Sequence, residues 1–204
     1  MKILLAALSC VLMGGVANAT VTTNLMLGGG GGLLATNSII INGNPLTDPV
    51  SGVSFTPTFQ LTSVGGNLFQ HSTGFGVSGA PGDNFINPTE SVTLSYAGIV
   101  GGGTNVTFEG FTDATLFATG VPGESALLTF STGSSSLTTD NPFPLGLDPG
   151  PLTLAGVSGA LPFQDTSVVL NAVGVQFSAV SVPEPGSLAA LGMLSMGVML
   201  RRRR

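Results

Sequence analysis

The chain has 204 residues, of which 43% are hydrophobic, with five basic and ten acidic side chains. The basic residues all lie close to one end or the other, so the stretch between Thr20 and Val182 holds every acid except Glu184, nine in all, and no Lys or Arg. Such a body excludes nucleic-acid binding, which needs basic side chains to displace phosphate counterions. Its apolar content also argues against intrinsic disorder, and one folded domain is expected.

The N-terminal segment MKILLAALSCVLMGGVANA has the three parts of a secretory signal peptide. Lys2 supplies positive charge, an apolar centre follows, and Ala17-Asn18-Ala19 is an A-x-A cleavage site. We therefore predict that residues 1–19 are a signal peptide and that the mature chain begins at Thr20. The only cysteine, Cys10, leaves with this segment, so the mature chain can form neither a disulfide nor a thiolate metal site.

A run of five glycines, residues 28–32, opens the body. It lacks the Lys and the Ser or Thr of a phosphate-binding loop, so we expect a flexible turn. Beyond it the dominant pattern is alternation of apolar and polar residues, which is typical of strands with one buried face. The alternating segments are 53–61, 91–96, 106–108, 114–119, 152–154 and 173–179.

Residues 20–181 are therefore predicted to be an all-β body of nine to eleven short strands. Gly, Pro and Asn interrupt the chain at short intervals, and no segment of the body has a helical period. This pattern favours an antiparallel β-sandwich, jelly-roll-like in connectivity. Pro57 lies inside the first alternating segment, so that segment is expected to be an edge strand or to carry a bulge.

Catalytic residue patterns are scarce in the body. His71 is the only histidine, no GxSxG motif accompanies it, and zinc would need further His or Cys ligands. No Lys or Arg is present to stabilise an anionic transition state. We expect the protein not to be an enzyme. A pair of acids acting as in glycoside hydrolases remains an alternative.

Calcium is the one metal that the composition favours, because hard cations bind carboxylate and carbonyl oxygens. The candidate ligands Asp83, Asn84, Asn87 and Glu90 lie in one turn-rich stretch. A second acidic stretch contains Asp140 and Asp148. The alternative is that these acids only keep an exported domain soluble.

The C-terminal segment VPEPGSLAALGMLSMGVMLRRRR combines two prolines, an apolar stretch and four arginines. Residues 186–200 carry no charge and would span about 22 Å as a helix, less than the ~30 Å of a hydrocarbon core. Length alone does not distinguish a short transmembrane helix from a buried one. The four arginines, Arg201, Arg202, Arg203 and Arg204, favour the membrane, because basic residues stop translocation and can snorkel.

This order of Val182-Pro183-Glu184-Pro185, apolar helix and terminal arginine cluster resembles the PEP-CTERM sorting signal of Gram-negative bacteria. The resemblance covers residues 182–204. It implies that Pro183, Glu184 and Pro185 are recognised by an exosortase, a membrane-embedded protease or transpeptidase. It also implies export through the secretion machinery, transient anchoring in the inner membrane, and final location at the cell surface or outside the cell.

The resemblance thus implies an exported, exosortase-sorted protein of the cell surface or extracellular matrix, associated with exopolysaccharide or biofilm. Two alternatives remain for the body: a carbohydrate-binding module, and a secreted hydrolase with an acid pair. The carbohydrate-binding alternative has few aromatic side chains on which a sugar ring could stack, because Trp is absent and Tyr96 is the only tyrosine.

Overall fold

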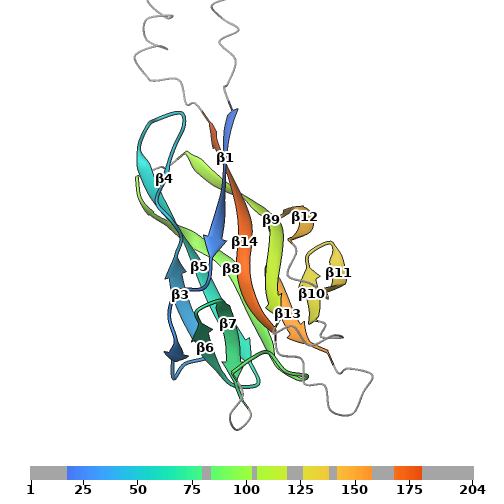
Figure 1. Cartoon of the computed structure of the whole chain (residues 1–204). Coiled ribbons are helices and arrows are strands. Elements are labelled where there is room, and N and C mark those ends of the chain that lie inside the picture. The colour runs from blue at the N-terminus through green and yellow to red at the C-terminus, as the bar shows by residue number, and fades with distance from the viewer. Residues whose placement is uncertain are drawn as a thin grey trace, which may run out of the picture.

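Two antiparallel sheets make up the part of the chain that the computed structural model describes, and these residues contain no helix (Figure 1). The described residues are 18–79, 84–102, 105–118, 126–137, 142–157 and 168–180. The predicted all-β class is confirmed. None of the described residues belongs to a helix long and apolar enough to cross a membrane. The expected C-terminal helix, at residues 186–200, lies outside these ranges.

The first sheet has seven strands in the order β12-β9-β14-β7-β6-β2, with β1 also paired to β14. Its strands are β1 (Asn18–Met26), β2 (Gly32–Leu33), β6 (Asn67–His71), β7 (Gly74–Ser78), β9 (Val106–Ala118), β12 (Phe143–Asp148) and β14 (Val168–Val180). The long strand β14 is the centre of this sheet. One of its edges pairs with β9, and the other pairs with β1 and then β7.

The second sheet also has seven strands, in the order β11-β10-β13-β8-β5-β3, with β4 also paired to β5. Its strands are β3 (Ser38–Asn42), β4 (Leu46–Thr47), β5 (Ser54–Val64), β8 (Ser91–Gly101), β10 (Ala126–Phe130), β11 (Gly133–Leu137) and β13 (Leu152–Gly156). Strands β5 and β8 form its centre, paired over ten registered positions.

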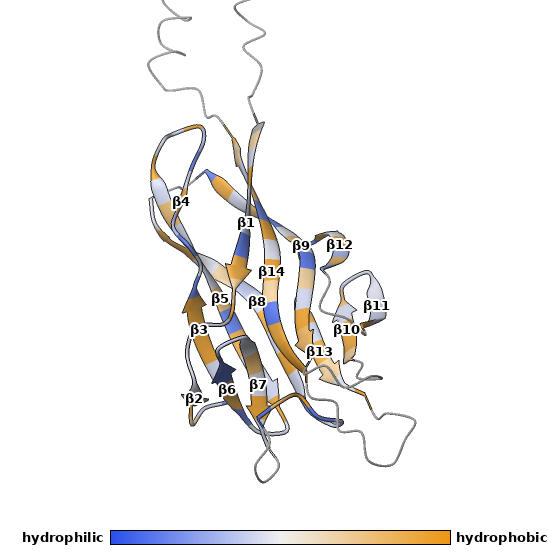
Figure 2. Ribbon diagram, in the orientation of Figure 1, coloured by the Kyte–Doolittle hydropathy of each residue, from blue (hydrophilic) through white to orange (hydrophobic). Residues whose placement is uncertain are grey.

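The core lies between the two sheets and follows from the alternation along their strands (Figure 2). On β14, Val173, Val175, Phe177 and Ala179 are all buried, as the period of two predicts. Rings from the two sheets meet there: Phe55 of β5 and Phe177 of β14 lie 5.5 Å apart, edge to face. This sharing of one core gives the protein a sandwich-like architecture.

Pro57 is accommodated differently from the prediction. Strand β5 is not an edge strand, because β8 pairs with one of its sides and β3 and β4 with the other. Pro57 lies between the stretches of β5 that pair with β3 and with β4, so its missing N–H costs no ladder hydrogen bond there. The bulge half of the prediction is confirmed, since the β5–β8 register shifts between Thr58 and Phe59.

The structure has more strands than expected, fourteen among the described residues instead of nine to eleven. Residues 106–108 and 114–119, predicted as separate strands, belong largely to the single strand β9, which has three register shifts against β14. Several strands have weak alternation and were not predicted, including the hairpins β6–β7 and β10–β11. Alternation of apolar and polar residues therefore does not predict the full extent of long bulged strands, and it does not predict short polar strands at all.

Candidate functional site

The first and the last strand of the described body, β1 and β14, are paired up to one end of the first sheet. Strand β1 begins at Asn18, which pairs with Val180, the last residue of β14. Ala19, the last residue of the predicted signal peptide, pairs with Ala179. The first residue of β1 and the last residue of β14 therefore lie side by side (Figure 1). Thr20, the predicted first residue of the mature chain, pairs with Ser178. The remaining processing residues lie outside the described ranges: Ala17, Pro183, Glu184, Pro185, Arg201, Arg202, Arg203 and Arg204.

Two connections between strands share this end with the termini. The turn from β4 to β5 contacts the connection from β8 to β9, where a Cβ on Gly102 would lie 2.2 Å from Cγ1 of Val53. The N–H of Val180 donates to the carbonyl of Asn105, which joins the second connection to β14. Here we call this part of the molecule the termini end.

Asp48 holds the β4–β5 turn in shape. Its carboxylate is 1% exposed and accepts hydrogen bonds from the Ser51 hydroxyl and, at 2.8 Å, from the N–H of Val50. The N–H of Gly52 donates to the Asp48 carbonyl at 2.8 Å. The Ser51 hydroxyl, followed by the Val50 N–H, holds the pKa of Asp48 below its ordinary value. This acid is a structural turn residue.

The predicted calcium ligands are placed only in part. Asp83 lies outside the described residues. Asn87 and Glu90 are joined by two hydrogen bonds within one turn. The N–H of Asn87 donates to Oε2 of Glu90 at 2.9 Å, and the N–H of Glu90 donates to the Asn87 carbonyl at 2.9 Å. Asn84 uses its backbone carbonyl to accept from His71. Calcium binding by these residues stays a prediction.

Asp148, from the second acidic stretch, is fully buried at the end of β12. Burial works to raise its pKa, but the Ser131 hydroxyl and the N–H groups of Gly150, Thr132 and Ser131 outweigh that effect, so the pKa lies below its ordinary value. The N–H of Gly150 donates to Oδ1 at 2.8 Å. Asp148 thereby fastens the β10–β11 hairpin to the end of β12. Asp140 is outside the described residues.

His71 has a structural environment. Nε2 lies 2.6 Å from the carbonyl oxygen of Asn84, and the ring stacks on Phe85 with centroids 4.7 Å apart. Phe69 lies against it at the same centroid distance. The histidine thus joins the β6 strand to the segment that follows β7.

The two other described acids have local partners on or beside β9. The hydroxyl of Ser178 donates to Glu109, and that of Thr112 donates to Asp113 at 2.9 Å. Within the described ranges, no three His, Cys, Asp or Glu side chains gather into a metal-binding group. Each described carboxylate accepts at least one hydrogen bond from a neighbouring hydroxyl or backbone N–H group, while Oδ2 of Asp148 is buried without a hydrogen-bond partner.

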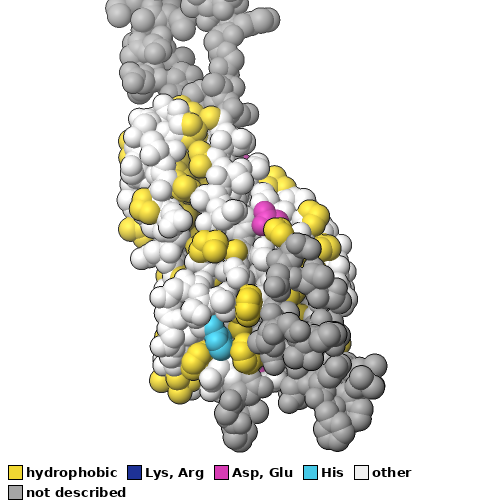
Figure 3. Space-filling view, in the orientation of Figure 1, with side chains coloured by type: hydrophobic (Ala, Val, Ile, Leu, Met, Phe, Trp, Pro, Cys, Tyr) yellow, Lys and Arg dark blue, Asp and Glu magenta, His cyan; other side chains and the backbone are white. Residues whose placement is uncertain are grey.

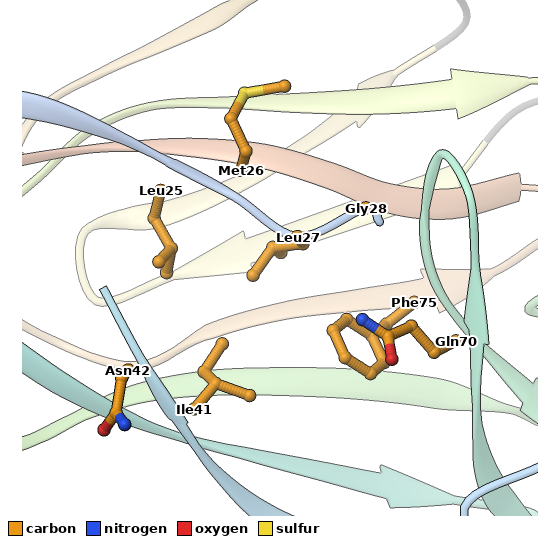
Figure 4. Close-up of a pocket in the computed structure, with 8 residues that line it drawn as sticks. All are labelled: Leu25, Met26, Leu27, Gly28, Ile41, Asn42, Gln70 and Phe75. Atoms are coloured by element: carbon orange, nitrogen blue, oxygen red, sulfur yellow. The ribbon is translucent and has the colours of Figure 1, made fainter. Parts of the chain in front are cut away.

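A hollow of about 260 Å³ lies at the open side of the sandwich, where β1 and β3 approach each other (Figure 4). Leu25 and Leu27 point into it toward Ile41, while Met26 points away. The amide side chains of Asn42 and Gln70 contribute polar groups to its lining. The residues that line the hollow include no acid–base pair.

Tyr96 does not offer a flat surface to a sugar ring. Its own ring stacks on Phe108 at 4.4 Å with an interplanar angle of 14°, and it meets Phe177 edge-on at 6.0 Å. Burial raises its pKa above the ordinary value. The single tyrosine is thus part of the aromatic core.

Sequence reasoning missed the pairing of the two chain ends. Thr20-Val-Thr-Thr-Asn-Leu25 does alternate at Val21, Thr23 and Leu25, so a strand was detectable immediately after the cleavage site. Its partner was not, because the pairing of β1 with β14 joins residues about 150 positions apart and depends on the completed sheet.

Residues 181–204 match the family model described as the PEP-CTERM protein-sorting motif. The match covers the C-terminal segment, directly after β14. No curated protein and no solved structure matches the chain.

Proposed function

Because the chain carries a PEP-CTERM protein-sorting motif, which indicates an exported protein sorted by an exosortase, we propose that its body is a non-catalytic component displayed at the cell surface or in the extracellular matrix. The observation that carries this proposal is the C-terminal motif. The signal peptide at residues 1–19 supplies entry to the secretion machinery, and the motif supplies the later sorting step.

The position of the motif in the sequence, directly after the last strand, supports a separation between the folded body and the sorting segment. Only Ser181 and Val182 separate Pro183 from the last paired residue of β14. The described body is therefore complete at Val180, before the motif begins in the sequence. A sorting enzyme then needs no unfolding of the body to reach the motif.

The polar outer face of the first sheet supports an association with exopolysaccharide. Thr20, Thr22 and Asn24 of β1 are exposed, and their hydroxyl and amide groups can both donate and accept hydrogen bonds. A body without Lys or Arg has no basic groups to pair with anionic sugars, so a neutral polysaccharide is the better partner.

Fractionation of the full-length chain tests the sorting function. Replacing Pro183, Glu184 and Pro185 together by alanine should abolish C-terminal processing, leaving a heavier protein retained in the membrane fraction. Ser181→Ala is the matched control, since it lies at the edge of the matched segment and outside its Pro-Glu-Pro core, and it should be processed normally. Identical mass and location for the wild type and the triple variant would contradict the proposal.

The two alternatives for the body predict different measurements. A carbohydrate-binding module would give a defined specificity on a glycan array, and the hollow between β1 and β3 is where substitutions such as Gln70→Ala should weaken it. A hydrolase with an acid pair would release sugar or ester products. The hydrogen bonds of the described carboxylates favour the non-catalytic proposal over this second alternative.

A further inference from the structure

We propose that the termini end of the body rests on the membrane surface while the sorting segment is in the bilayer, and that exposed valines there contact the lipid interface. This inference rests on the proposed function, because it requires the C-terminal segment to be membrane-inserted. It adds an orientation of the body relative to the membrane. The end of β1 and β14 at which Asn18 and Val180 lie faces the membrane, and the opposite end of the sandwich points away from it.

Four exposed valines occupy this end of the molecule. Val50 and Val53 lie in the β4–β5 turn, Val100 near the end of β8, and Val180 at the end of β14. Val100 is 62% exposed and Val53 is 44% exposed. The contacts between the two connections and β14 bring these side chains to one end of the fold, which is drawn at the top of Figure 1.

The length of chain beyond β14 limits how far the body can stand from the membrane. The apolar stretch begins at Gly186, six residues after Val180. Six extended residues reach about 20 Å. By contrast, Val64 at the other end of β5 lies eleven residues from Val53, which is roughly 36 Å along a strand. The short tether therefore keeps the valines, and not the far end, near the lipid.

The charges described at the termini end are compatible with this contact. Bacterial and other biological membranes with anionic lipids repel a body that carries nine acids and no bases. At the termini end, the described acid of the β4–β5 turn is Asp48, whose carboxylate is turned inward. Glu109 lies further along β9 and accepts a hydrogen bond from Ser178. Apolar and uncharged groups, which Figure 3 shows interspersed over this part of the surface, are thus what meets the headgroups.

The absence of tryptophan from the sequence allows a direct test. The chain from Thr20 to Arg204, as it exists after the predicted signal cleavage, is reconstituted into vesicles of phosphatidylethanolamine and phosphatidylglycerol as Val53→Trp, Val100→Trp or Val64→Trp. The last is the matched control, because Val64 is 64% exposed and ends β5, the strand that begins directly after Val53. Flotation with the vesicles reports insertion, and quenching by lipids brominated on their acyl chains reports contact of the indole with the bilayer.

The expected result is flotation of all three proteins, with several-fold stronger quenching for Val53→Trp and Val100→Trp than for Val64→Trp. Flotation with equal quenching at both ends, or with none, overturns the orientation and leaves the sorting function standing. A blue-shifted indole without quenching shows that a second copy of the chain covers the valines, which also overturns it. Failure to float overturns both the orientation and the membrane step of the proposed function.

Discussion

At the scale of single residues, the acids of this protein act mainly as acceptors that fix turns. Asp48 and Asp148 lie at the ends of short connections and collect nearby hydroxyl and N–H donors. Both have pKa values below the ordinary 3.8 in the folded protein. A carboxyl group with a lower pKa when folded stabilises the fold above its unfolded pKa, and this contribution is lost as the pH falls further.

We therefore expect the free energy of unfolding to be constant near neutral pH and to fall below about pH 4. Asp48→Asn should lower it by roughly 1 kcal/mol at pH 7, because it replaces a charge-assisted acceptor in the turn. The same variant should lose less stability than the wild type on acidification. Urea unfolding at pH 7 and pH 3 measures both effects.

Asp113→Asn serves as the control for Asp48→Asn. Asp113 is only partly buried and accepts from the adjacent Thr112, so its substitution should change stability much less. Equal losses for the two variants, or an unchanged acid response in Asp48→Asn, would show that the turn does not depend on this carboxylate.

Residues of this kind show what the sequence cannot reveal. Acids were expected to be calcium ligands or solubilising groups, yet Asp148 is buried against a hairpin whose turn lies some 17 positions earlier. Gly28 was expected to be flexible, but a Cβ there would come within 2.3 Å of the Ser72 carbonyl oxygen, so it permits close packing. Both roles depend on tertiary neighbours.

At the scale of elements, β9 is bent over the core and needs a glycine to do so. Gly110 has φ of 152°, and a Cβ there would lie 2.7 Å from the backbone carbonyl of Asp148 on β12. It lies beside a register shift against β14, where Gln176 is its partner. The glycine thus allows both the bulge and the close approach of β12.

Gly110→Ala should consequently destabilise the protein by roughly 1–3 kcal/mol, since it combines an unfavourable φ with a backbone clash. Gly31→Ala is a suitable comparison, because a Cβ added there would have no heavy atom within 4 Å, and it should be close to neutral. Thermal unfolding followed by far-ultraviolet circular dichroism measures the difference. A stable Gly110→Ala variant would mean that β12 moves away without cost.

Strands with clean alternation and a buried face were predictable, and those without it were not. The inner residues of β14 and of β8, such as Val175 and Leu94, are buried as their alternation predicts. Strand β11, Gly-Ser-Ser-Ser-Leu, is defined by its pairing with β10 and not by its own sequence. Pairing with neighbouring strands therefore determines which segments of weak intrinsic strand propensity become strands.

At the scale of the whole molecule, the body between residues 20 and 182 combines nine acids with no Lys or Arg. Its like charges repel one another in the compact state, and salt screens this repulsion. The apolar core between the sheets must outweigh the repulsion, since no basic side chain of the body is available for compensation. Stability should therefore depend on ionic strength.

We expect the melting temperature to rise between roughly 0.01 M and roughly 1 M NaCl, over which the Debye length falls from about 30 Å to about 3 Å. Adding two positive charges on the exposed face of β1, as Thr22→Lys and Asn24→Lys, should weaken this dependence of the melting temperature on salt.

Calcium binding by the predicted ligands Asp83, Asn84, Asn87 and Glu90 is tested separately, by comparing the melting temperature in calcium chloride and in magnesium chloride at equal ionic strength. A calcium-specific rise that Asp83→Asn removes would establish a site, and equal effects of the two salts would contradict it.

The pairing of β1 with β14 also bears on how the protein crosses a membrane. The strand nearest the N-terminus is joined over nine registered positions to the final strand of the body, so the first sheet cannot be completed until Val180 has emerged on the far side. A translocation channel carries extended polypeptide. Because its closing partner comes last in the sequence, the first sheet can be completed only on the far side of the membrane, even though the second sheet does not need β14.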